Sequence, residues 1–591
     1  MSRVTSPQEL DQRFRTAVAK LRAEATESAD PAEPIREGAR LTGAQALKIF
    51  EAQLTSRHLD LAARWLRSFG EGYYTVASAG HEGNAAVALA VRPTDPALLH
   101  YRSGAYYVTR ADQAGYADAA RDVLRGLAAA ATDPGAGGRH KVFGHPALAI
   151  IPTAATTAAH LPRAVGLAYA LEYRRDRRPR PSAEPPEGKP WPDDAIVVCS
   201  FGDGSVNHAT ARAAFNTAGW LVHRGEKVPV LFVCEDNGLG NSVRSPEGWV
   251  RASLEALPGV RYLSADGCDV VATYDAAVAA AEWVRTQRRP AVLHLNLVRF
   301  LGHAGADTET TYRTKAEIEA DLARDPLLAT AALLVGRGLL TPDEVLARYD
   351  EVGWRVRRVA EEVIGEPKLG SAADIVAALA PRRPVRVARA VADAADFALG
   401  PGQAARLEAF GGRLPEKAGP LTLAQTINAA LTDALLTNPA IVVFGGDVAA
   451  KGGVYGVTKG LRDRFGPRRV FDTLLDETSV LGLALGAGLG GLLPVPEIQY
   501  LAYLPNAGDQ LRGEAAALQF LSSAAFRNPM VVRVPGLAYQ EGFGGPFVQT
   551  AERTVEPFHN DNSVALLRDI PGLVVAVPSS AAEAAPMLRT C

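Results

Sequence analysis

One pattern occurs twice in the first half of the chain, in Ala195-Ile-Val-Val-Cys-Ser-Phe-Gly-Asp-Gly-Ser205 and in Val228-Pro-Val-Leu-Phe-Val-Cys-Glu-Asp-Asn-Gly238. Each segment begins with an apolar run typical of a buried strand, and residues that include Gly, Asp or Asn follow that run. Ligand sites of parallel sheets lie at the carboxyl ends of the strands. The two runs therefore predict neighbouring parallel strands with polar groups at one edge.

These polar groups suit a phosphate bound through a divalent cation. Asp203 and Asn237 offer the oxygen ligands that Mg²⁺ prefers. Gly202 and Gly204 allow the backbone to approach a phosphate closely. The alternative is a pair of ordinary strand-to-loop turns, because Gly, Asp and Asn are also good turn formers. The rest of the chain has to distinguish the two.

Composition indicates a globular intracellular protein. Of the 591 residues, 47% are hydrophobic and 22% are charged, and the net charge of −2 offers no basic field for nucleic acid or an acidic membrane. The four cysteines lack CxxC spacing, which favours a reducing cytoplasm over disulfides or a zinc site. No apolar run predicts a signal sequence or a membrane span.

Strands and helices alternate along the chain, so we expect an α/β fold with parallel sheets and helices on both faces. Strands are expected near 195–201, 228–234, 291–298, 440–445, 494–500, 529–534 and 573–577. The basic, Pro-rich segment 174–194 and the segment 222–228 are expected to be loops. The expected divisions are a polar leader over 1–45, a first α/β domain over 46–330, a helical extension over 331–365, a linker over 366–417 and a second α/β domain over 418–591.

Glu477 is the most informative residue of the second domain. It precedes the Gly- and Leu-rich helix expected from Val480. Packing at such a helix start would largely desolvate the carboxyl group and favour its protonated form, which can exchange a proton with a ring nitrogen. The alternative is an ordinary acid stabilised by the helix dipole.

Further motifs make the chain resemble the thiamine-diphosphate-dependent E1 component of 2-oxo acid dehydrogenase complexes, with α- and β-type subunits fused in one polypeptide. The α-like half contains Tyr101-Arg102, Gly202-Asp-Gly204, Glu235-Asp-Asn237 and Gly302-His303. The β-like half contains Gly452-Gly-Val-Tyr-Gly-Val-Thr458, Arg469-Val-Phe-Asp-Thr473, Glu477, Glu497-Ile-Gln499 and Tyr503. The resemblance implies two thiamine-diphosphate-binding domains joined by a linker.

The resemblance implies a role for each motif residue. Asp203, Asn237 and the Leu239 carbonyl would bind Mg²⁺. Glu477 would contact the pyrimidine ring of the cofactor, and His303 and His559 would serve substrate positioning and acyl transfer. The other residues implied to bind the cofactor are Tyr101, Arg102, Gly202, Gly204, Ser205, Gln499 and Tyr503.

The implied activity is oxidative decarboxylation of a 2-oxo acid, with acyl transfer to the lipoyl group of an E2 acyltransferase. We favour a branched-chain substrate, with pyruvate as the alternative, and expect a homodimer or larger oligomer. Transketolase-like ketol transfer and an inactive cofactor-binding assembly protein are the other possibilities.

The sequence differs from the pattern of this family in four respects. Asp236 adds a charge beside the expected metal ligand, and His160 replaces a glutamine of a monovalent-cation site. Extra sequence around 542–557 makes His559 the least secure assignment. Because the family continues beyond the equivalent of Ser580, we also expect the chain to lack a C-terminal transketolase-type domain.

Overall fold

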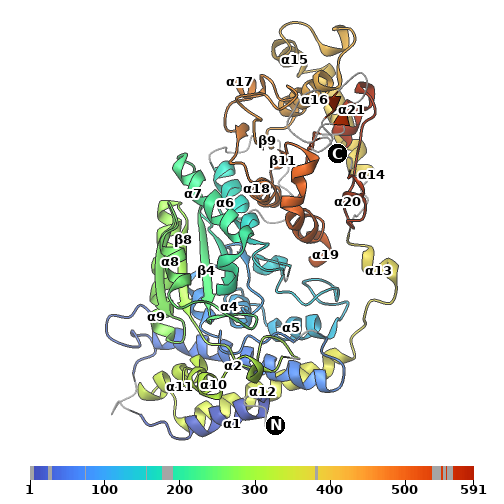
Figure 1. Cartoon of the computed structure of the whole chain (residues 1–591). Coiled ribbons are helices and arrows are strands. Elements are labelled where there is room, and N and C mark those ends of the chain that lie inside the picture. Colours follow the sequence, from blue (N-terminus) through green and yellow to red (C-terminus); the bar gives the residue numbers. More distant parts are fainter. Residues whose placement is uncertain are drawn as a thin grey trace. The chain divides into compact units, whose positions relative to one another are not determined.

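The computed structural model describes residues 6–23, 29–73, 75–154, 156–175, 191–305, 307–379, 384–535, 548–549, 554–555, 559 and 563–591. The chain forms two compact units. Unit 1 comprises Met1–Ala164, Leu171–Val376 and Phe520–Phe526, and unit 2 comprises Val165–Ala170, Ala377–Gln519 and Arg527–Cys591 (Figure 1).

Unit 1 is built on a parallel six-stranded sheet with the order β2-β1-β3-β4-β8-β7. In the register of the two central strands, Gly202 pairs with Glu235, so both polar motifs end at the same edge. A short antiparallel pair follows the second motif. The strands are β1 (Ala97–Leu98), β2 (Ile150–Ile151), β3 (Val197–Gly202), β4 (Val230–Asp236), β5 (Leu239–Gly240), β6 (Val243–Arg244), β7 (Arg261–Asp266) and β8 (Ala291–Asn296).

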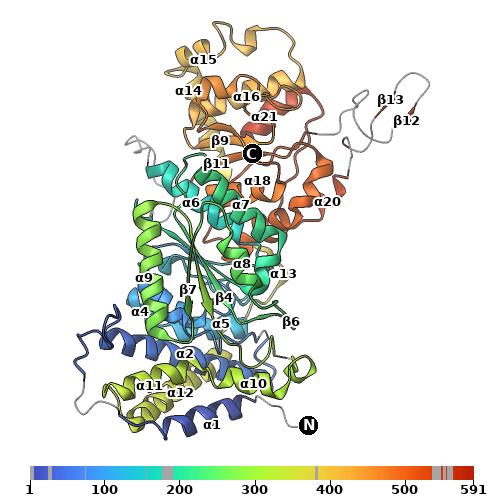
Figure 2. The same ribbon diagram turned by 60° about the vertical axis from the view of Figure 1, so that its left-hand side comes forward.

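Helices cover both faces of this sheet, as the apolar runs predict. Alternate residues of a strand point to opposite faces. On one face, Leu231 and Val233 share a buried cluster with α9 (Val270–Gln287), which Figure 2 shows alongside the strands. On the other face, Phe232 meets Phe215 of α7 (Ala209–His223) edge to face, with ring centroids 5.1 Å apart. Because both faces are buried, the strands read as continuous apolar segments.

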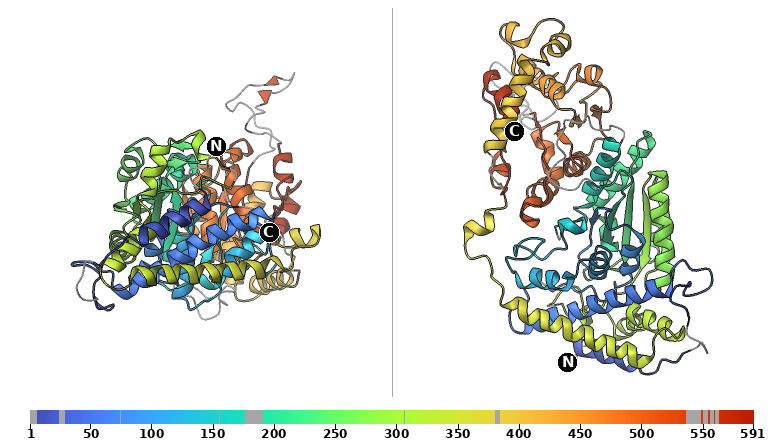
Figure 3. Two further views of the ribbon diagram at one scale, coloured as in Figure 1. Left: turned by 90° about the horizontal axis from the view of Figure 1, so that it is seen from below. Right: turned by 180° about the vertical axis from the view of Figure 1, so that it is seen from behind.

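A layer of helices packs beside the sheet, with α12 running along α2 (Figure 3). Capping boxes at Thr42 and Thr341 fix the starts of these two long helices. The expected helical extension, 331–365, contains the end of α11 and the whole of α12. The helices of unit 1 are α1 (Pro7–Val18), α2 (Gly43–Ser68), α3 (Asn84–Ala90), α4 (Gly104–Gln113), α5 (Ala119–Ala128), α8 (Trp249–Glu255), α10 (Lys315–Leu322), α11 (Pro326–Gly336), α12 (Pro342–Ile364) and α13 (Ala372–Val376), with the 3₁₀ turns η1 (Pro146–Leu148), η2 (Asp203–Asn207) and η3 (Glu309–Thr311); α6 (Leu161–Arg175) has residues in both units.

The first 45 residues are not merely a polar leader. Leu10, Phe14 and Val18 are buried on one side of α1, and the Phe14 ring stacks on Tyr349 with centroids 4.7 Å apart. These apolar residues recur every four positions among charged ones, which is the period of an amphipathic helix. The prediction of a polar leader over 1–45 did not take this period into account.

Unit 2 contains a three-stranded parallel sheet with the order β10-β9-β11. Leu431 and Leu435 of α16 pack on Val443 of the central strand. The strands are β9 (Ile441–Gly445), β10 (Val470–Asp472) and β11 (Leu493–Glu497), with a separate antiparallel pair of β12 (Val548–Gln549) and β13 (Thr554–Val555). The helices are α14 (Pro384–Leu399), α15 (Gln403–Ala409), α16 (Leu423–Thr437), α17 (Leu461–Phe465), α18 (Glu477–Leu489), α19 (Leu518–Leu521), α20 (Ala565–Arg568) and α21 (Ala581–Thr590), with the turns η4 (Pro415–Lys417), η5 (Leu501–Ala507) and η6 (Gln510–Ala515).

Several expectations about chain organisation differ from the structure. The expected linker, 366–417, contains α13, α14 and α15; the Ala-rich sequence of α14 favours a helix. Residues 573–577 form no strand, and only Arg533 of 529–534 makes a strand-like bridge, to Glu497. Most of 174–194 and 542–557 lies outside the described residues.

Among the described residues, none of the helices is long and apolar enough to cross a bilayer. The four cysteines, all of them described, are free thiols. Cys199, Cys234 and Cys268 are buried, and Cys591 is exposed.

Candidate functional site

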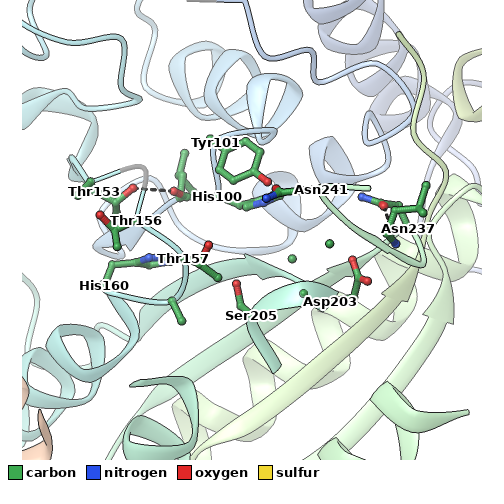
Figure 4. Close-up of a pocket in the computed structure, with 17 residues that line it drawn as sticks. His100, Tyr101, Thr153, Thr156, Thr157, His160, Asp203, Ser205, Asn237 and Asn241 are labelled. Carbon is green, nitrogen blue, oxygen red and sulfur yellow. Dashed lines mark hydrogen bonds between the residues drawn. The ribbon is translucent and has the colours of Figure 1, made fainter. Parts of the chain in front are cut away.

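A cavity of about 190 Å³ lies in unit 1 at the carboxyl ends of β3 and β4. Asp203 and Ser205 lie along one side, Tyr101 lies across from them, and Asn237 and His160 lie towards opposite ends (Figure 4). The lining residues are Leu99, His100, Tyr101, Thr153, Ala154, Thr156, Thr157, Ala158, His160, Gly202, Asp203, Gly204, Ser205, Asn237, Leu239, Gly240 and Asn241. The two strand-end motifs therefore open into one polar cavity.

Asp203 begins the 3₁₀ turn that follows β3, and it is buried. Its carboxylate accepts a hydrogen bond from the Ser245 hydroxyl. Burial, together with the negative charge of Asp236, raises the pKa of Asp203 above its ordinary value. A cation in the cavity would relieve both effects, because it favours the ionised carboxylate.

The backbone beside Asp203 passes very close to β5. A Cβ atom on Gly204 would lie 2.9 Å from the Cα of Gly240. Real Cβ atoms essentially never come that close to backbone, so the turn requires glycine here. This close approach keeps the cavity wall free of side chains beside the oxygen ligands, as a phosphate cradle needs.

Asn237 follows the end of β4 and is held at both ends of its carboxamide. Its Oδ1 accepts a hydrogen bond from the Leu239 amide at 3.2 Å, and its Nδ2 lies 2.9 Å from Nε2 of His81. The neighbouring Asp236 accepts from Gly238 N at 2.9 Å and pairs with His294 at 2.7 Å, and it does not line the cavity. Asp236, which we expect to add a charge beside the metal, is therefore bonded to groups that do not line the cavity.

Sequence reasoning missed a buried group of titratable side chains behind Asn237, namely His81, His100 and Glu235. His81 Nδ1 lies 2.8 Å from Glu235 Oε2, and His100 Nδ1 lies 3.6 Å from the same oxygen. Although burial opposes it, the neighbouring rings of His100 and His81 lower the pKa of Glu235 well below its usual range. Burial lowers the pKa of His81 to about 4, partly offset by Glu235. No local pattern signals this group, because only the fold joins its members.

Tyr101 lines the cavity, whereas Arg102 does not. The Arg102 guanidinium is buried and donates to the carbonyls of Ala77 at 2.5 Å and His303 at 2.9 Å. The His303 ring also meets the Tyr101 ring edge to face at 6.3 Å. The structure thus brings together Tyr101, Arg102 and His303, with Arg102 turned to the protein.

His160 occupies the far end of the cavity, beside three threonines. Its Nε2 donates to the Ser200 carbonyl at 2.9 Å, and burial lowers its pKa to about 3. The Thr153 hydroxyl donates to the Leu99 carbonyl at 3.1 Å, and Thr156 and Thr157 also line the wall. This end of the cavity offers hydroxyl groups and a neutral ring.

The remaining candidate residues lie in unit 2. Glu477 is the first residue of α18, is half-buried, and accepts from Asn506 Nδ2 at 3.3 Å. The strong desolvation that we expect for its carboxyl group is therefore only partial here. Gln499 Nε2 donates to Asp447 at 2.8 Å. His559 meets the rings of Tyr500 and Tyr503 edge to face at 5.2 and 5.6 Å, which brings two of the predicted residues together.

Two family models match the chain. The model described as dehydrogenase E1 component covers residues 53–370, which is more than half of the chain. The model described as transketolase, pyrimidine binding domain covers residues 420–550. These matches fit two domains of the thiamine-diphosphate-binding type and agree with the α/β architecture of the two units.

The second match corrects one expectation. We expected the chain to lack a C-terminal transketolase-type domain, whereas residues 420–550 match a transketolase-type domain. The expectation is wrong, because a domain of that type is present in the C-terminal half.

Similar proteins include β subunits of two dehydrogenases. The 3-methyl-2-oxobutanoate dehydrogenase subunit beta of Mycobacterium tuberculosis (strain CDC 1551 / Oshkosh) is 39% identical over 169 residues, which are 29% of this chain and 45% of that protein. The pyruvate dehydrogenase E1 component subunit beta of Staphylococcus epidermidis (strain ATCC 35984) is 39% identical over 168 residues, 28% of this chain and 48% of that protein. The chain spans about half the length of these relatives. On the match over residues 53–370, this chain belongs to the dehydrogenase E1 component family.

Proposed function

We propose that this chain is a 2-oxo acid dehydrogenase that uses thiamine diphosphate and Mg²⁺ for oxidative decarboxylation. One observation carries the proposal: Asp203 and Asn237 face one cavity beside Gly202 and Gly204, within the segment that matches the E1 component. Carboxylate and carboxamide oxygens suit a small hard cation, and glycine backbone suits the phosphates that such a cation bridges.

The cavity offers a donor set for the charged end of the cofactor. Asp203 and Asn237 would bind Mg²⁺ through side-chain oxygens, and Leu239 would add its carbonyl. Tyr101 and Ser205 offer hydroxyl groups to the diphosphate. Arg102 would need to turn from the Ala77 and His303 carbonyls to reach a phosphate, although its guanidinium suits one.

When bound, thiamine diphosphate supplies the carbon nucleophile and the electron sink for cleavage beside a carbonyl. Within unit 2, we assign Glu477 to hold and move a proton at the pyrimidine ring. Its position at the start of α18, where its carboxylate accepts from Asn506, leaves it half-buried rather than enclosed. Gln499 and Tyr503 complete the proposed pyrimidine contacts.

The substrate we favour is a branched-chain 2-oxo acid, with acyl transfer to the lipoyl group of an E2 partner. The two β subunits named above are equally similar to this chain, and one acts on 3-methyl-2-oxobutanoate while the other is a pyruvate dehydrogenase component. Our preference therefore rests on the resemblance of the β-like half. We assign His303 and His559 to substrate positioning and acyl transfer. We also propose that the chain, with its domains 46–330 and 418–591, forms a homodimer or larger oligomer.

A panel of 2-oxo acids with an artificial electron acceptor tests this proposal. We expect Mg²⁺- and thiamine-diphosphate-dependent turnover that is faster with 3-methyl-2-oxobutanoate than with pyruvate. Equal rates would contradict the preference, and cofactor binding without turnover would favour an assembly protein. Ketol transfer between sugar phosphates, without decarboxylation, would favour a transketolase.

A further inference from the structure

Behind the cavity wall, Glu235 and His81 form a hydrogen-bonded chain that ends at Asn237, and the proposed function uses neither Glu235 nor His81. Glu235 is the penultimate residue of β4, two positions before Asn237, and His81 reaches them from the segment preceding α3. His81 and Glu235 are fully enclosed, with relative exposures of 0%. Their geometry determines which end of the Asn237 carboxamide faces the cavity.

Glu235 acts only as a hydrogen-bond acceptor. Its Oε1 accepts from the Ser103 hydroxyl at 2.7 Å, and its Oε2 accepts from Asn84 Nδ2 at 3.3 Å. The same Oε2 faces His81 Nδ1 at 2.8 Å. A carboxylate has no proton to offer, so Nδ1 of His81 must carry the hydrogen in this contact.

The tautomer of His81 then determines the orientation of Asn237. With its proton on Nδ1, a neutral imidazole presents a lone pair at Nε2. Nε2 lies 2.9 Å from Asn237 Nδ2, so the carboxamide donates there. On its other side, Oδ1 accepts from Leu239 N at 3.2 Å and is the end left to meet a cation.

We propose that His81, oriented by Glu235, is a positioning residue that holds the Oδ1 of Asn237 towards the Mg²⁺ site. This inference rests on the proposed function, because it assumes a cation at Asn237. Without His81, the carboxamide can rotate and present its NH₂ group, which repels a cation. Such supporting hydrogen bonds typically change metal affinity by about 10- to 100-fold.

The same three buried side chains, His81, His100 and Glu235, could instead bind a transition metal themselves. Their ligand atoms lie within 4.8 Å of one another. However, both ring nitrogens of His81 already have partners, and both oxygens of Glu235 accept hydrogen bonds. The hydrogen-bonded chain therefore explains the group better than a metal centre.

The test measures Mg²⁺ affinity by calorimetry, titrating MgCl₂ into the full chain at a fixed saturating concentration of thiamine diphosphate. We expect His81→Leu to weaken Mg²⁺ binding about 10- to 100-fold. We expect His81→Gln to stay near wild type, because its amide can both donate to Glu235 and accept from Asn237. His223→Leu, the same change at an exposed position, is the control.

A double-mutant comparison separates orientation from general stability. In Asn237→Asp, both terminal atoms of the side chain are oxygens, so either of them can face the cation. His81→Leu should therefore cause little further loss of Mg²⁺ affinity in the Asn237→Asp background. Equal losses in both backgrounds would contradict the proposal. If His81→Leu does not fold, Glu235→Gln gives the same test, because a glutamine can donate to Nδ1 and reverse the tautomer.

The outcomes distinguish this inference from the function on which it rests. If wild type binds no thiamine diphosphate with Mg²⁺, the proposed function fails, and the inference fails with it. If wild type binds and folded His81→Leu binds equally well, only the inference fails. Stoichiometric zinc in wild type that is lost in His100→Leu, measured by elemental analysis, would overturn the positioning role in favour of a metal centre.

Discussion

Arg102 and His303 form a direct pair in unit 1: Nη2 of Arg102 donates to the His303 carbonyl at 2.9 Å and lies 3.2 Å from its Nδ1. Burial, followed by the positive charges of Arg102 and Arg299, lowers the pKa of His303 to about 4. His303 is therefore neutral near pH 7, and its Nδ1 accepts from the guanidinium. Any role it has in substrate positioning must use the neutral ring.

Removing the Arg102 charge should raise the pKa of His303. Arg102→Gln eliminates one of the charges that disfavour the imidazolium, while burial keeps the pKa below its ordinary value of 6.5. NMR titration of the His303 ring measures the change. Arg92→Gln, at an exposed arginine, is the control. An unchanged or lower pKa in Arg102→Gln would contradict this account of the pair.

His559→Gln should slow acyl transfer more than decarboxylation. The His559 ring is packed edge to face against Tyr500 and Tyr503, so its position is defined by aromatic contacts within unit 2. We expect turnover with a lipoyl acceptor to fall by about 100-fold or more, which is the lower end of acid–base contributions, and turnover with ferricyanide to fall less. Equal losses with both acceptors would remove the specific transfer role.

Glu477→Gln should abolish most of the turnover and leave cofactor binding in place. A glutamine preserves the shape of the residue at the start of α18 and its contact with Asn506, but it cannot exchange a proton. We expect a loss of about 100- to 10,000-fold in kcat. Glu408→Gln, at an exposed position of unit 2, is the matched control. Full activity in Glu477→Gln would show that Glu477 does not hold and move a proton at the pyrimidine ring.

The free energy of unfolding of unit 1 should be lower in acid because of the buried His58 ring. Burial lowers its pKa from 6.5 to about 4, and its ring packs on Tyr349 with centroids 4.2 Å apart. Between these two values the unfolded chain binds the proton more readily, so the free energy of unfolding falls as pH falls from about 6.5 to 4 and is flat above. The full shift corresponds to about 3 kcal/mol.

Urea unfolding at pH 7, 5.5 and 4.5 measures this contribution. The dependence on pH should be smaller in His58→Gln than in wild type, because glutamine does not titrate in this range. His223→Gln, at an exposed position, should follow wild type. The same pH dependence in wild type and His58→Gln would exclude His58 as a source.

The sequence predicted the centre of the fold better than its edges. The runs at 195–201 and 228–234 are apolar because β3 and β4 are covered on both faces, and such burial is visible in sequence. By contrast, β1 and β2 have only two residues each, and β7 is partly exposed, so none of them forms an apolar run. The buried side of α1 around Phe14 was not predicted, because charged residues separate its apolar positions.

The candidate site was predictable where a residue belongs to a local motif. Asp203 and Asn237 follow strands, and the register of the sheet brings those strand ends together. The contact of His81 with Glu235 was not predictable, because 154 positions separate the two residues and neither sits in a pattern that requires the other. Likewise, the inward turn of Arg102 depends on carbonyl groups that only the folded chain provides.

The central claim is that the cavity at the ends of β3 and β4 binds thiamine diphosphate through Mg²⁺ held by Asp203 and Asn237. Calorimetric titration of thiamine diphosphate into wild type, with Mg²⁺ and with EDTA, tests it most directly, beside Asp203→Asn and the exposed control Asp193→Asn. We predict Mg²⁺-dependent binding by wild type and Asp193→Asn, and a loss of about 100-fold or more in Asp203→Asn, because the carboxylate charge that would neutralise the cation is removed. Binding that is independent of Mg²⁺, or unchanged in Asp203→Asn, would contradict the claim.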